Sequence, residues 1–139
     1  MPIAKELTVH MEDRPGTLGR ICRTLADRGV NLLGFQSLPH EGESLVRLVV
    51  DNPMIARSVF ETERLRFTET EVAQVKLAHR PGELARAASR LGENNININY
   101  AYTGIEPGTN APLLFFGVAD AARAASILEQ AASAATGGV

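Results

Sequence analysis

Asp13-Arg14-Pro15-Gly16-Thr17-Leu18 is the stretch that decides the fold, because the chain repeats it 66 residues later as His79-Arg80-Pro81-Gly82-Glu83-Leu84. The same offset aligns apolar and amide residues on either side of the motif: Val9 with Val75, Leu25 with Leu91, Val30 with Ile96 and Asn31 with Asn97. Beyond a turn-rich stretch at 104–112 the offset becomes 68, which places the two extra residues in a loop. A register held over more than fifty residues indicates an internal duplication.

Each copy is expected to run strand, helix, strand, strand, helix. The first strand shows in the alternation of Leu7, Val9 and Met11 with polar residues. A helix then begins near Gly16, with apolar residues at the i, i+3, i+4, i+7 spacing: Leu18, Ile21, Cys22 and Leu25 in copy one, and Leu84, Ala87, Ala88 and Leu91 in copy two.

The second half of each copy begins with strands at 30–37 and 96–103. The apolar runs 45–50 and 113–118 predict central strands that are covered on both faces. The second helices are expected to begin at Asn52-Pro53 and Asp120, since Asn and Asp are favoured N-cap residues.

This order predicts an α+β protein made of two tandem ferredoxin-like βαββαβ modules, residues 4–70 and 71–135. Residues 65–71 suit a fourth strand in the first module, followed by a short turn. The alanine- and glycine-rich end of the chain suits no strand, so the second module is expected to lack its last one. Residues 72–78 would then form an open edge, which favours a homodimer, unless the strand at 65–71 crosses over to cover it.

Composition excludes several functional classes. The chain has 139 residues, a net charge of −2 and 45% apolar residues, so it offers no basic field for nucleic acid or an anionic membrane. It holds no apolar run of about 18 residues and no signal-peptide core, which predicts a cytoplasmic protein without a membrane span. RNA-binding modules can share this strand order, and they stack bases on aromatic side chains of the sheet. Tyr100 and Tyr102 could act in this way, but the neighbouring predicted strand at 113–118 lacks the basic residues expected of an RNA-binding sheet.

The Arg-Pro-Gly turns are the candidate binding features. The proline fixes the backbone, and a glycine without a Cβ lets a ligand approach closely. The helix N-terminus that follows favours a carboxylate. Equally, each motif could be only a tight strand-to-helix turn. Asn31 and Asn97 could pair with an ammonium or a carboxylate, or could satisfy a local backbone group, and Asn99 is a weaker candidate.

No catalytic or metal set is evident. Cys22, the one cysteine, falls on the buried helix face, where packing is its expected role. The three histidines form no metal-binding spacing, and no cofactor fingerprint is present.

The chain resembles the ACT domain family over roughly residues 5–130, and in particular small stand-alone proteins made of two ACT domains. The residues that carry the resemblance are Asp13-Arg14-Pro15-Gly16-x-Leu18 with Gly29-Val30-Asn31-Leu32, and His79-Arg80-Pro81-Gly82-x-Leu84 with Asn95-Ile96-Asn97-Ile98. The resemblance implies a ferredoxin-like fold, side-by-side pairing of sheets, and amino-acid sites where the loop before a domain's first helix faces a neighbour's second strand.

Carried onto this sequence, the resemblance nominates two sets of ligand-binding residues: Asp13, Arg14, Pro15, Gly16, Thr17 and Leu18 with Asn31, and His79, Arg80, Pro81, Gly82, Glu83 and Leu84 with Asn97. His79 stands where copy one has an acid, and Asn95 where it has a glycine, so the two loops differ chemically.

The expected function is therefore a non-catalytic amino-acid sensor that acts in trans on an enzyme or transporter of amino-acid metabolism. The alternative is a structural or interaction subunit with degenerate ligand sites. A small enzyme ranks third.

Overall fold

The computed structural model describes residues 3–137, and side chains up to residue 130. Ten elements follow one another along the chain: β1 Ile3–Glu12, α1 Thr17–Asp27, β2 Leu32–His40, β3 Glu43–Val50, α2 Pro53–Thr62, β4 Arg66–Lys76, α3 Glu83–Glu93, β5 Tyr100–Ile105, β6 Pro112–Gly117 and α4 Ala121–Gly137. The protein is α+β, with a strand-helix-strand-strand-helix order that occurs twice. No helix in the described part of the chain is both long and apolar enough to cross a bilayer.

The chain forms two compact units. One unit comprises Lys5–Thr70, and the other comprises Glu71 onward together with the first residues of β1. Two strands therefore contribute to both units. Ile3 and Ala4 of β1 belong with the second half of the chain, and β4 divides between Thr70 and Glu71.

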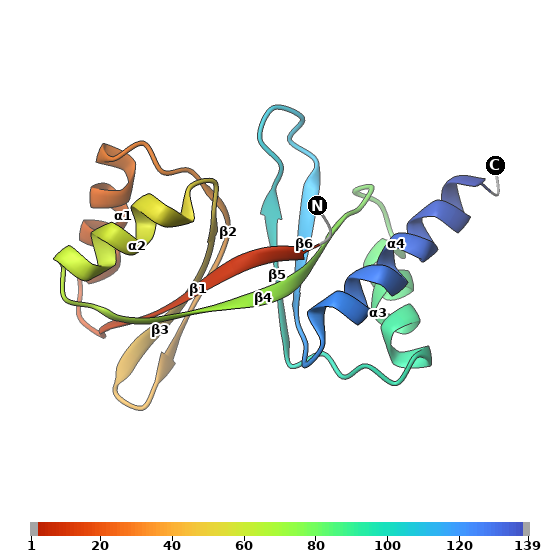
Figure 1. Cartoon of the computed structure of the whole chain (residues 1–139), viewed down its shortest axis with the longest axis horizontal. Coiled ribbons are helices and arrows are strands. Elements are labelled where there is room, and N and C mark those ends of the chain that lie inside the picture. Colours follow the sequence, from red (N-terminus) through yellow and green to blue (C-terminus); the bar gives the residue numbers. More distant parts are fainter. Residues whose placement is uncertain (1–2, 138–139) are drawn as a thin grey trace. The chain divides into compact units, whose positions relative to one another are not determined.

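The 5–70 unit has the strand order β4-β1-β3-β2 of a ferredoxin-like module. Strand β3 pairs antiparallel with both β1 and β2, with Val9 opposite Val46. Helices α1 and α2 lie on one face of this sheet (Figure 1). The core between them consists of fully buried side chains from both layers: Leu7, Val9, Ile21, Leu25, Val46, Leu48, Val59 and Phe60.

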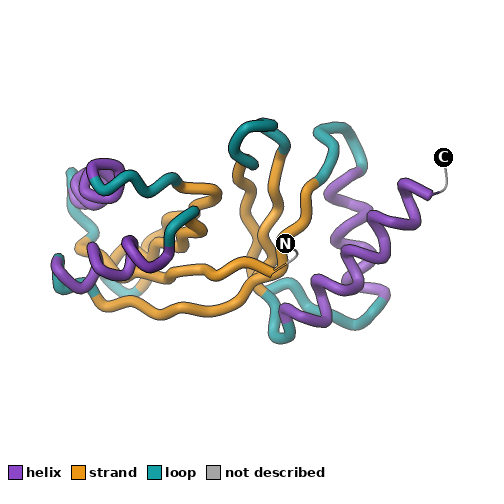
Figure 2. Tube along the Cα trace, turned by 45° about the horizontal axis from the view of Figure 1, so that its top comes forward, coloured by secondary structure: helices purple, strands orange, loops and turns teal. Residues whose placement is uncertain are grey.

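The other unit arranges its strands as β5-β6-β4, with β1 on the free side of β4. Ile3 at the start of β1 packs against the core that Ala73, Leu91, Phe116 and Leu128 help to form. Helices α3 and α4 lie side by side, as Figure 2 also shows. The start of β1 thus stands where a fourth strand would lie, and no strand follows α4 within the described residues.

The central strands are buried on both faces, as the apolar runs predict. On β3 the adjacent residues Val49 and Val50 are both buried, and on β6 Phe115 and Phe116 are 0% and 1% exposed. Tyr102 is only 8% exposed and its ring stacks on Phe115. Its position is that of a packed side chain, which differs from the displayed aromatics of an RNA-binding sheet.

Three strand predictions need correction. Strand β2 begins at Leu32 rather than residue 30, and β5 begins at Tyr100 rather than residue 96, although Ile96 and Ile98 pack on the core as expected. No turn follows residue 71, because 66–76 form one unbroken strand that contains neither glycine nor proline. Since β4 lies between β1 and β6, the open edge expected at 72–78 is absent.

The helix ends explain one departure between the repeats. Gly29 after α1 has φ of 74°, and Asn95 after α3 has φ of 59°. Both residues therefore adopt the left-handed conformation that closes a helix. Asn is among the few non-glycine residues that enter this region readily, so Asn95 replaces glycine with little change of backbone.

Candidate ligand site at the first Arg-Pro-Gly turn

The first turn leaves the N-terminus of α1 open. Gly16 is the N-cap residue, with φ of 93°, and no side chain caps the helix. The N–H of Thr17 donates to the carbonyl of Arg14 at 3.3 Å. The N–H groups of Gly16, Leu18 and Gly19 have no acceptor among the described residues. Such free N–H groups at a helix start form a ready site for an anion.

A cavity of about 760 Å³ opens in front of this helix start. All of its lining residues belong to the 5–70 unit, and they carry four arginines, one histidine and three glutamates. The lining consists of His10, Glu12, Arg14, Pro15, Gly16, Thr17, Arg20, Glu43, Glu63, Arg64, Leu65 and Arg66. A small molecule that bears both charges would find a partner for each on these walls.

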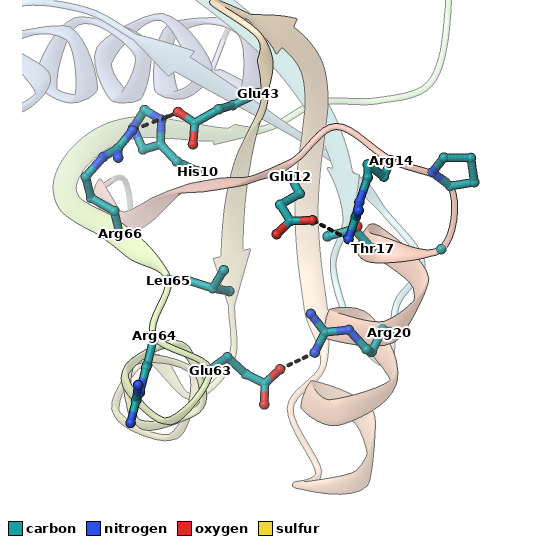
Figure 3. Close-up of a pocket in the computed structure, with 12 residues that line it drawn as sticks. His10, Glu12, Arg14, Thr17, Arg20, Glu43, Glu63, Arg64, Leu65 and Arg66 are labelled. Carbon is teal, nitrogen blue, oxygen red and sulfur yellow. Dashed lines mark hydrogen bonds and ion pairs between the residues drawn. The ribbon is translucent and has the colours of Figure 1, made fainter.

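Ion pairs hold the charged side chains around the cavity (Figure 3). Arg14 Nη2 lies 2.7 Å from Glu12 Oε2, and both side chains are well exposed. Arg20 of α1 donates to Glu63, the residue that ends α2. Pairs between exposed side chains contribute only about 0.2–1 kcal/mol, so a ligand can displace the Arg14–Glu12 pair at little cost.

The far wall of the cavity comes from the strand ends. Arg66 Nη2 at the start of β4 donates to Glu43 Oε1 at 2.8 Å, and His10 Nδ1 lies 3.6 Å from the same oxygen. Arg64 has no ion-pair partner within the described chain, and its side chain extends away from the other labelled residues (Figure 3). Arg14, Arg20 and the helix start are therefore the groups best placed to receive an anion.

Residues 5–59 match the ACT domain family. The matched segment includes the Arg-Pro-Gly turn, α1 and most of α2, and so contains much of the cavity wall. The match covers less than half of the chain, within the first repeat. No curated protein matches the chain at the required significance.

Solved structures extend the likeness in fold to nearly the whole chain. Protein BT0572 from Bacteroides thetaiotaomicron has a TM-score of 0.80 at 20% identity, covering 93% of this chain and 88% of that one. The regulatory subunit of aspartate kinase from Thermus thermophilus, in its ligand-free form, has a TM-score of 0.63 at 17% identity and covers 94% and 92%. Its Thermus flavus counterpart has a TM-score of 0.61 at 16% identity and covers 94% and 93%. These TM-scores establish a shared fold.

The second turn differs from the turn in the ACT segment, although its backbone is nearly the same. Gly82 caps α3 with φ of 91°, and again no side chain caps the helix. The cavity there measures about 140 Å³ and is lined by Leu77, Ala78, His79, Arg80, Glu83, Leu84, Thr103, Pro112, Leu113 and Leu114. Glu83 accepts from Arg80 Nε at 2.8 Å and from Arg86 Nη2 at 2.9 Å. The hydrogen bond from Arg80 is the main cause that lowers the pKa of Glu83.

Some of the nominated residues line neither of the two cavities. Asn31 follows the far end of α1 and lines neither cavity; its N–H donates to Asp51 Oδ1 at 2.9 Å. Asn97 likewise lines neither cavity and donates to Asn99 Oδ1 at 3.0 Å. Asp13 accepts from Ser44 Oγ at 3.2 Å. Their part in ligand binding stays a prediction.

The two leucines of the motif also differ. Leu18 packs against the core of the 5–70 unit, as its helical spacing predicts. Leu84 is 54% exposed and lines the smaller cavity, so its expected place in the buried stripe is wrong. The stripe of α3 is formed instead by Ala87 and Leu91, which are 6% and 0% exposed.

Sequence reasoning did not single out most of the charged wall: His10, Glu12, Arg20, Glu43, Glu63, Arg64 and Arg66. One signal was available for Arg20, because the offset of 66 residues that aligns the motifs also aligns Arg20 with Arg86. The rest come from the ends of other strands and of α2, and nothing in local spacing brings them to the turn.

Proposed function

We propose that the protein is a non-catalytic sensor that binds a small amino acid at the first Arg-Pro-Gly turn. Its target would be an enzyme or transporter of amino-acid metabolism, regulated in trans. The observation that carries the proposal is the combination of free N–H groups at the start of α1 with a large cavity whose walls bear charges of both signs.

An amino acid fits these walls by its chemistry. Its carboxylate would accept from the N–H groups of Leu18 and Gly19, with Arg14 and Arg20 beside them. Its ammonium would pair with Glu12 or Glu63, each of which now pairs with one of those arginines. On binding, the ligand would therefore replace these internal ion pairs with ion pairs to its own carboxylate and ammonium.

Regulation would follow from a difference in affinity. A ligand that binds one conformation or assembly more tightly shifts the population towards it. The ACT match supports small-molecule sensing, and the fold shared with the aspartate kinase regulatory subunits makes a kinase of amino-acid metabolism a reasonable first partner to test.

A tandem pair of ACT domains, a cytoplasmic location and a homodimer are parts of this proposal. A structural subunit with degenerate sites is the alternative, which the small cavity at the second turn favours.

A thermal-shift screen against the twenty amino acids, one at a time at millimolar concentration, tests the proposal. At about 100 times Kd, ligand linkage contributes about 2.7 kcal/mol, a rise in Tm on the order of 5–10 °C. The variant Arg20→Gln is expected to weaken binding about tenfold or more. Arg28→Gln, at the other end of the same helix, is the matched control and should keep the full shift.

If no amino acid moves the transition or gives heat in calorimetry, the sensor proposal fails. Copurification with a larger enzyme in the absence of any ligand response would then support the structural subunit.

A further inference from the structure

The two turns have the same arginines but differ in the first residue of the helix. Arg14 and Arg20 in copy one align with Arg80 and Arg86 in copy two. Between them, Thr17 in copy one aligns with Glu83 in copy two. Each helix begins after a left-handed glycine with no side-chain cap, so the backbone setting of these two positions is nearly identical.

In the second turn both arginines are engaged by one carboxylate of the chain itself. Glu83 Oε1 accepts from Arg80 and Glu83 Oε2 accepts from Arg86, so each oxygen takes one guanidinium. Glu83 is one of two charged residues buried in the described structure, with 9% of its surface exposed. An acid that served the helix dipole alone would need neither this burial nor both arginines.

In the first turn no carboxylate takes that place. Thr17 carries no charge, and the two arginines turn instead to separate acids on other elements, Arg14 to Glu12 and Arg20 to Glu63. The space in front of the helix start is correspondingly larger, about 760 Å³ against about 140 Å³.

We propose that Glu83 is an internal ligand that fills the second turn, so that a free carboxylate is admitted at the first turn alone. The proposal rests on the proposed function and deepens it, since it assigns one ligand site to each chain and names the residue that decides where it lies. A tethered carboxylate competes at a high effective concentration, so a free amino acid in the millimolar range does not displace it.

Exchanging the two residues between the turns tests the proposal. We would follow the backbone amides of the ¹⁵N-labelled full chain by NMR during a titration with glycine, the simplest molecule that carries the carboxylate and ammonium of every amino acid. Wild type should show saturable shifts at Leu18 and Gly19 and none at Leu84 and Ala85. Glu83→Thr should respond at both turns. Thr17→Glu should respond at neither.

Two further variants serve as controls for the loss of any acid from α3 and for misfolding of Glu83→Thr. Glu93→Thr removes another acid from α3, one that pairs with Arg90 at 3.6 Å at the far end of the helix, and should behave as wild type. Glu83→Gln removes the charge while keeping nearly the same shape, so it reports on the second turn if Glu83→Thr does not fold. The dispersion of the amide spectrum shows whether each variant is folded.

The outcomes separate this inference from the proposed function. Saturable shifts at the second turn of wild type, or a folded Glu83→Thr and Glu83→Gln that respond only at the first turn, would overturn the role of Glu83. A first turn that stays silent while the second turn of Glu83→Thr responds would uphold Glu83 and sink the proposed site. Silence at both turns in every variant would reject both.

Discussion

Glu83 and Thr17 show that a difference at one aligned position can give two copies of the same motif different binding chemistry. Glu83 gives the second turn a built-in anion, and Thr17, which carries no charge, leaves the first turn with the larger cavity. Sequence alone showed that the two turns were chemically unequal. It could not show which one was filled, because that depends on whether Arg80 and Arg86 reach the same carboxylate.

The lowered pKa of Glu83 predicts how stability depends on pH. A carboxylate whose pKa is lower in the folded than in the unfolded chain adds stability above its ordinary value of 4.5 and loses it as the pH falls through the folded value. The free energy of unfolding of wild type should therefore exceed that of Glu83→Gln at pH 7. The gap should shrink as the pH falls below 4.5. Urea titrations at a series of pH values measure it, and a gap that widens in acid would contradict the ion-pair assignment.

Gly16 offers a test of close backbone approach at the ligand site. The space around its missing Cβ is empty to 4 Å, but its φ of 93° disfavours any other residue. Gly16→Val should lower the free energy of unfolding by about 1–3 kcal/mol and also abolish amino-acid binding.

Gly82→Val and Gly29→Val are its controls, because both glycines have positive φ and equally empty surroundings. They should lose similar stability and keep the affinity of wild type in calorimetry. A folded Gly16→Val with unchanged affinity would exclude the first turn as the binding site.

At the scale of elements, the sequence predicted the helices better than the strand ends. Asn52 accepts from the N–H of Ile55, and Asp120 accepts from the N–H of Arg123, so both predicted helix starts are confirmed. Helix starts could be predicted because capping is local chemistry. The start of β5 and the continuity of β4 could not, because pairing with a strand distant in sequence decides where a strand begins or ends.

The cap of α2 gives a measurable prediction. Asn52→Ala removes the side-chain acceptor for the N–H of Ile55 and should lower the free energy of unfolding by about 1 kcal/mol. Ser58→Ala, on the exposed side of the same helix, should change it by less than about 0.5 kcal/mol. Equal effects of the two substitutions in urea denaturation would mean that the cap adds no stability.

At the scale of the whole molecule, the homodimer prediction loses the open strand edge from which it was argued. The expected open edge at 72–78 is covered, since β4 lies between β1 and β6. Exposed apolar residues remain, among them Phe35 at 42% and Ile105 at 59%. We retain the homodimer as the expected state at micromolar concentration. Light scattering coupled to size exclusion should give a mass near twice 14.9 kDa, and a mass near 14.9 kDa across a dilution series would refute it.

The division of β4 between Thr70 and Glu71 has a consequence for how the repeats can be handled. The boundary between the two units lies inside strand β4 rather than in a flexible linker. A protease therefore finds no exposed loop to cleave at this boundary. If the two halves were expressed separately from this boundary, each would keep only part of β4. The second half would also lose Ile3 from its core. Although the two halves repeat one sequence pattern, neither half holds a complete sheet of its own, and a graft of this protein onto another should carry both halves.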